Sequence, residues 1–116
     1  MPSVIAHELG HNFGLLHSGT TRCQSAMEGS APPCDVDEYG DLYDVMGYSW
    51  SQIGSLNAVQ SARLGVLPAG QVQTVTPSDS GGTYTLSPMG TTSGTRAVRL
   101  VLGSTTYYLE YRAAVG

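Results

Sequence analysis

Lysine is absent from the chain, and all five basic residues are arginine. Charged residues make up only 12% of the sequence, and the formal net charge is -4. Proteins that bind nucleic acid or an anionic membrane surface carry a basic patch, which this composition does not supply. No run is long and apolar enough to span a bilayer. We therefore expect neither a nucleic-acid nor a membrane partner.

Cysteine is scarce too. Cys23 and Cys34 are the only two, and both lie in a stretch with the composition of a loop. They do not form a Cys-x-x-Cys pair, so a thiolate zinc knuckle is not indicated. In an oxidising compartment they would form a disulfide that closes a short loop and contributes on the order of 3 kcal/mol. Two free thiols are the alternative.

The low charge leaves Ser, Thr, Gly and Gln to make up much of the surface, which is common in secreted proteins. The first residues, 1–4, lack the basic region and the cleavage site of a signal peptide. We therefore expect an extracellular or secreted parent protein whose signal peptide is not part of this chain.

Residue patterns predict an α+β fold that begins with two helices. Apolar residues recur at helical spacing over residues 3–14, and Gly14 can end that helix because glycine accepts a left-handed conformation. Residues 18–43 show no sustained periodicity and are predicted to be a loop. A second helix is expected over residues 58–64, with Asn57 as its N-cap.

The residue pattern changes after residue 68, where short runs of residues that favour β-strands alternate with turn residues. We expect residues 1–68 to form one partial domain and residues 69–116 to form an incomplete β-rich segment with antiparallel strands. The expected strands are residues 71–76, 83–86, 97–102 and 106–112, the last two as a hairpin.

All three histidines of the chain lie in residues 7–17, with the spacing His-Glu-x-x-His-x-x-Gly-x-x-His. His7 and His11 are four residues apart, so on a helix both imidazoles lie on one face and can share a metal ion. His17 is too far along to share that face, but Gly14 allows a sharp turn that brings it back. Three histidines leave the fourth position of a tetrahedral Zn²⁺ open, as in catalytic zinc sites.

Glu8 follows the first histidine and can reach the side of the metal without ligating it. A carboxylate in this place suits a general base that takes a proton from a metal-bound water. A bare His-Glu-x-x-His occurs by chance on many helices. Its extension to five fixed positions makes Zn²⁺ the expected cofactor.

The extended motif resembles that of the metzincin zinc metallopeptidases, which pair it with a downstream methionine turn. Residues 43–48 contain a candidate turn with Met46. The resemblance implies that Met46 packs beneath the zinc-binding histidines, whereas by itself it would more often be an ordinary core or loop methionine. Within the clan, the chain is most similar to the gametolysin-like family in residues 7–14, 39–41, 45–47, 56–60, 63–65 and 107–112.

This resemblance implies a zinc metalloendopeptidase that hydrolyses peptide bonds in protein or peptide substrates through a zinc-activated water, with Glu8 as general base. Residues 1–68 would then be the C-terminal half of a metzincin catalytic domain, with the zinc helix, the methionine turn and a second helix. Metzincins build a further subdomain before the zinc helix. We therefore expect a fragment of a larger secreted protease that is inefficient alone. An inactive zinc-binding fragment and a β-rich adhesion or docking module remain alternatives.

The tyrosine of the candidate turn has two interpretations. In the astacin and serralysin branches, a tyrosine two residues after the turn methionine reaches the zinc or the reaction oxyanion. Tyr48 holds that position in this sequence. A side chain that lines the wall of the substrate pocket is the alternative.

An acidic stretch also has two interpretations. Asp-x-Asp with a following glycine is similar to a calcium loop, but the third acidic position and the terminal glutamate are missing. A solvated acidic loop is the alternative to a calcium site. The residues concerned are Asp35, Asp37, Glu38, Asp41 and Asp44.

Overall fold

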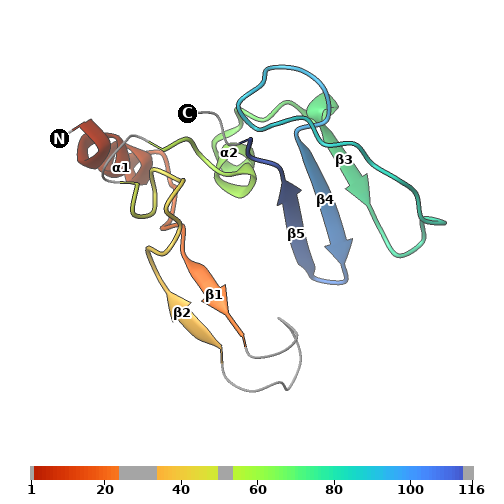
Figure 1. Cartoon of the computed structure of the whole chain (residues 1–116), viewed down its shortest axis with the longest axis horizontal. Coiled ribbons are helices and arrows are strands. Elements are labelled where there is room, and N and C mark those ends of the chain that lie inside the picture. The colour runs from red at the N-terminus through yellow and green to blue at the C-terminus, as the bar shows by residue number, and fades with distance from the viewer. Residues whose placement is uncertain (1, 24–33, 50–53, 114–116) are drawn as a thin grey trace. The chain divides into compact units, whose positions relative to one another are not determined.

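The computed structural model describes residues 2–23, 34–49 and 54–113. The chain divides into two compact units, Met1–Leu56 and Asn57–Gly116. Helices and small sheets give an α+β layout (Figure 1). This division precedes the second helix, whereas the sequence analysis placed a boundary after residue 68. The difference arises because the second helix packs against a strand of the second unit.

The first unit begins with α1 (Pro2–Asn12), which covers most of the predicted helix. Gly14 has a φ of +85°, the left-handed conformation that glycine adopts without steric cost. Its amide donates to the carbonyl of His11 (3.0 Å), and the amide of Leu15 donates to the carbonyl of Gly10 (3.1 Å). These two hydrogen bonds form a Schellman turn, which ends the helix as predicted.

One face of α1 is apolar and exposed. Ile5 is 69% exposed, Leu9 51% and Phe13 62%. Because these residues are four apart, they form one stripe along the helix.

No helix among the described residues is long and apolar enough to cross a membrane.

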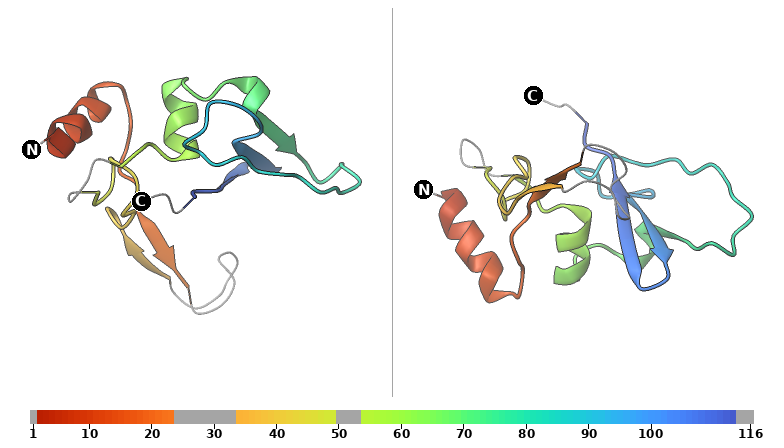
Figure 2. Two further views of the ribbon diagram at one scale, coloured as in Figure 1. Left: turned by 45° about the horizontal axis from the view of Figure 1, so that its top comes forward. Right: turned by 90° about the horizontal axis from the view of Figure 1, so that it is seen from below.

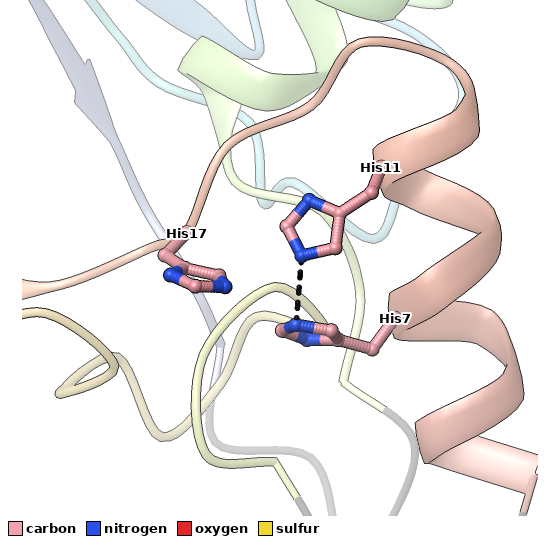
Figure 3. Close-up of side chains that lie close together, drawn as sticks. All are labelled: His7, His11 and His17. Carbon is pink, nitrogen blue, oxygen red and sulfur yellow. Dashed lines mark hydrogen bonds between the residues drawn. The ribbon is translucent and has the colours of Figure 1, made fainter.

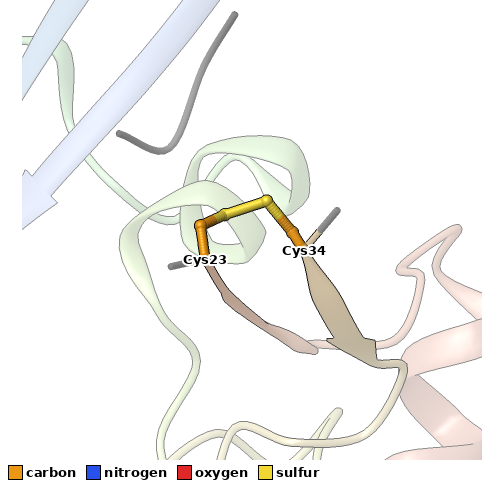
Figure 4. Close-up of a disulfide and its surroundings, with 2 residues drawn as sticks. All are labelled: Cys23 and Cys34. Atoms are coloured by element: carbon orange, nitrogen blue, oxygen red, sulfur yellow. A yellow bond between two sulfur atoms is a disulfide. The ribbon is translucent and has the colours of Figure 1, made fainter. Parts of the chain in front are cut away.

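A short hairpin follows α1. Strand β1 (Thr20–Arg22) pairs antiparallel with β2 (Asp35–Asp37). The prediction of a loop over residues 18–43 is therefore wrong for these strands. Their side chains are almost all exposed, so neither strand has an apolar face that alternation could reveal. Beside the strand ends, Cys23 and Cys34 form a disulfide (Figure 4).

The second unit begins with α2 (Ala58–Leu64), whose bounds match the prediction. The Asn57 side chain accepts a hydrogen bond from the amide of Gln60 at 2.9 Å, which is the expected N-cap. Gly65 ends the helix in a left-handed conformation with φ of +81°. Both ends of α2 therefore depend on residues directly beside them.

A short 3-10 helix, η1 (Ala69–Gln71), leads into a three-stranded sheet of order β3-β4-β5. The strands are β3 (Val72–Val75), β4 (Ala97–Leu102) and β5 (Thr105–Glu110). The predicted hairpin is confirmed, because β4 and β5 pair antiparallel.

Strand β3 corrects the expectation of antiparallel strands, because it pairs parallel with β4. The long connection over residues 76–96 carries the chain back to the end of the sheet where β3 began, and parallel pairing requires such a return (Figure 2). The expected strand over residues 83–86 lies in this connection and is not a strand. A small core joins α2 to the sheet through Ala58, Leu67, Met89 and Ala97.

Candidate metal centre

The three histidines converge in the first unit (Figure 3). Helix α1 supplies His7 and His11 from successive turns, and the segment after the Schellman turn brings His17 to them. One ring nitrogen from each lies within 4.8 Å of the others. All three side chains are half-buried. The prediction that the three histidines come together is therefore confirmed, and the cluster could hold a metal ion.

Each imidazole is oriented through its Nδ1 atom. That atom of His7 lies 2.9 Å from the carbonyl oxygen of Val45, and that of His11 lies 2.8 Å from the carbonyl oxygen of Leu15. Carbonyl oxygens only accept hydrogen bonds, so both Nδ1 atoms must donate. In a neutral imidazole the proton then resides on Nδ1, and the Nε2 atom keeps its lone pair.

The third imidazole is also oriented by a hydrogen bond from its Nδ1 atom, but the acceptor is a side chain. Nδ1 of His17 lies 2.7 Å from Oε1 of Glu38. An ionised carboxylate also only accepts, so this Nδ1 donates as well. All three rings are therefore held in the tautomer whose Nε2 is available to a cation.

The Nε2 atoms of His7 and His11 lie 3.1 Å apart, as the dashed line in Figure 3 marks. Two lone pairs cannot share a hydrogen bond, so this contact needs either an added proton or a metal cation next to both atoms. Two nitrogens bound to one tetrahedral zinc at the usual Zn–N length lie about 3.3 Å apart. The spacing of this nitrogen pair is therefore close to that of two ligands on one metal ion.

Met46 is fully buried against α1. A β-carbon added to Gly10 would clash with the Met46 sulfur, so glycine at this helix position allows the contact. The turn that contains Met46 also bonds to the residue after the third histidine, because the amide of Ser18 donates to the carbonyl of Met46 at 2.9 Å. Together with the bond from His7 to Val45, these contacts fix the turn beside the cluster.

A hollow of about 340 Å³ adjoins His7, and Glu8 and Tyr48 both line it. Glu8 is exposed, and Tyr48 is 39% exposed. The ring of Tyr48 stacks on that of Tyr39 at 5.2 Å between centroids. The structure thus brings both sequence-predicted catalytic candidates to the same hollow as a histidine of the cluster.

A second hollow of about 490 Å³ adjoins His11 and His17. Exposed Leu16 and Val36 contribute apolar surface to it. The cluster therefore has a hollow beside its first histidine and another beside its second and third.

Three aspartates of the acidic stretch accept hydrogen bonds from nearby backbone amides. Side-chain oxygens of Asp37, Asp41 and Asp44 each accept from the amide two residues ahead, at 3.1, 2.9 and 2.6 Å. Such bonds define Asx turns. Across residues 2–23, 34–49 and 54–113, the histidines are the one group of three or more potential ligands that converges. The calcium interpretation gains no support from this arrangement.

Sequence reasoning missed the acceptors that orient the histidines. Two are backbone carbonyls, which no side-chain pattern marks. The third, Glu38, was assigned only to the acidic stretch. The signal that could have singled it out is its position directly before residues 39–41, a segment already noted for family resemblance.

The disulfide is consistent with an extracellular protein, since such bonds persist in oxidising compartments. Comparison of the chain with protein-family models, curated proteins and solved structures found no match.

Proposed function

We propose that this chain carries the metal-binding and catalytic residues of a secreted, zinc-dependent metalloendopeptidase of the metzincin type, most similar to the gametolysin-like family. The observation that supports the proposal best is the convergence of the three histidine rings, with Glu8 lining the hollow that adjoins His7. This ligand set leaves a tetrahedral site with one open position, as catalytic zinc requires and structural zinc does not.

The roles of the residues follow from their positions. His7, His11 and His17 hold Zn²⁺ through Nε2 while their Nδ1 atoms donate to fixed acceptors. Bound zinc supplies a Lewis acid that lowers the pKa of a water molecule and polarises a carbonyl. Neutral imidazoles keep the net charge of the site positive, which favours both effects.

Glu8 moves the protons of the reaction. Its exposed carboxylate lines the same hollow as His7 and is not needed as a ligand. It accepts a proton from the attacking water and delivers it to the leaving amine nitrogen, so that one carboxylate acts first as base and then as acid. Tyr48, whose side chain lines that hollow, donates its phenolic hydrogen to the developing oxyanion.

A polypeptide substrate suits the surroundings of the cluster. The hollows beside the histidines could take side chains from either side of a scissile bond in an extended peptide. Their exposed apolar residues, Val4 in one and Leu16 and Val36 in the other, favour apolar side chains there.

The test compares the unaltered chain with Glu8→Gln and His11→Ala. Zinc content is measured after dialysis, and cleavage of an unstructured protein is followed by mass spectrometry at high enzyme concentration. We expect one zinc per chain in the unaltered protein and in Glu8→Gln, with activity at least about 100-fold lower in the variant. His11→Ala should lose both zinc and activity. Equal cleavage by Glu8→Gln and the unaltered chain would contradict the proposed proton transfer.

A further inference from the structure

His17 differs from the other two histidines in how it is held. His7 and His11 stand on α1, and both donate to backbone carbonyls that no substitution can remove. His17 stands on an irregular segment beyond the helix and donates to a side chain. It is therefore the histidine whose orientation depends most on neighbouring residues.

Two consecutive residues contact the His17 ring in different ways. Oε1 of Glu38 lies 2.7 Å from Nδ1, at the edge of the ring. The ring of Tyr39 packs against the imidazole with its centroid 4.0 Å away and a tilt of 38°. An edge contact fixes rotation within the ring plane, and a face contact limits tilting out of that plane. Together they leave the imidazole little freedom.

The backbone holds these two residues close to His17. A β-carbon at Gly19 would clash with the carbonyl of Asp37, and one at Gly40 would clash with the side chain of Thr20. The two segments therefore approach as closely as only glycine permits. Their pairing continues along β1 and β2 to the disulfide. The hairpin thus presents the two contact residues from a fixed support.

We propose that Glu38 and Tyr39 are positioning residues that orient His17 and thereby set the affinity and geometry of a divalent metal in the three-histidine centre. The inference rests on the metal-binding part of the proposed function and does not require peptidase activity. The Tyr39 ring also stacks on Tyr48, so the arrangement links the third histidine to a residue of the first hollow.

The test is a Co²⁺ titration of the metal-free chain, followed by visible absorption, with Zn²⁺ affinity obtained by competition against a chelator. Glu38→Ala should weaken binding about 10- to 100-fold, the usual effect of losing a partner that orients a ligand. Glu38→Gln should lose less, because its amide oxygen still accepts from Nδ1. Tyr39→Ala should alter the cobalt spectrum, and Tyr39→Phe should restore it because the ring contact remains.

Asp35→Asn is the matched control, since it removes one negative charge from the same exposed segment, at the far end of β2 from Glu38. It should change affinity less than about twofold. Equal losses in Asp35→Asn and Glu38→Ala would show a general charge effect and overturn the positioning role. So would an unaltered affinity and spectrum in Glu38→Ala.

A double-mutant cycle with His17→Ala separates positioning from loss of fold. Once His17 is gone, adding Glu38→Ala should cause no further loss of affinity, because the two residues act as a unit. Additive losses would contradict the inference. If the unaltered chain fails to bind Co²⁺ or Zn²⁺ stoichiometrically, the proposed metal centre itself is wrong, and this inference falls with it.

Discussion

Replacing Gly10 with alanine tests the packing of Met46 against α1. In an exposed helix, this change stabilises by up to about 1 kcal/mol, because glycine is the poorer helix former. Here the new methyl group would clash with the Met46 sulfur, and Met46 is fully buried, so it has no solvent to move into. Overpacking of this kind costs about 1–3 kcal/mol. The clash should outweigh the propensity gain, leaving a net loss of about 0–2 kcal/mol.

The same substitution should reverse its sign when Met46 is first shortened to alanine. Met46→Ala leaves a cavity and costs about 2–5 kcal/mol, but it also removes the clashing atoms. In that background Gly10→Ala should be neutral or stabilising. Urea unfolding of the metal-free chain, followed by circular dichroism, gives all four free energies. A stabilising Gly10→Ala in the unaltered background would refute the reasoning, since it would mean that Met46 does not pack on this turn of α1.

Four further predictions concern separate parts of the chain. Glu8→Gln should keep zinc, measured by elemental analysis, because the role proposed for the carboxylate is to act on water and not on the metal. Zinc affinity should weaken in acid, because protons compete with the metal for the ligand nitrogens, and undiminished zinc retention in acid would argue against three histidine ligands. Cys23 and Cys34 should resist alkylation without prior reduction, as checked by mass spectrometry. Leu15→Ala should cost about 2–5 kcal/mol in urea unfolding because Leu15 is 3% exposed, whereas Phe13→Ser on the exposed stripe should cost less than about 0.5 kcal/mol.

Features fixed by neighbouring residues could be predicted from the sequence. The end of α1 at Gly14 and the N-cap of α2 at Asn57 each depend on a few adjacent positions, and both predictions are confirmed. The convergence of the three histidines could also be predicted, because it depends only on residues 7–17. One helix turn separates the first two, and one glycine turn returns the third.

Features fixed by distant pairing could not be predicted. Strands β1 and β2 expose nearly all their side chains, so their alternation carries no burial signal. The parallel pairing of β3 with β4 depends on the path of residues 76–96, which no residue pattern encodes. Glu38 follows β2 and His17 precedes β1, so their contact depends on the pairing register of these two strands. The sequence did not reveal that register.

The three Nδ1 hydrogen bonds have a mechanical consequence. They lead from the histidines to the methionine turn, to the end of α1 and to the hairpin. An ion held by the three rings would therefore connect these three segments through one additional bond to each ring. By mass action, free metal at 1,000 times its dissociation constant would raise the stability of the first unit by about 4.1 kcal/mol. A chelator added to the metal-loaded chain should therefore lower the stability of the first unit by the same amount.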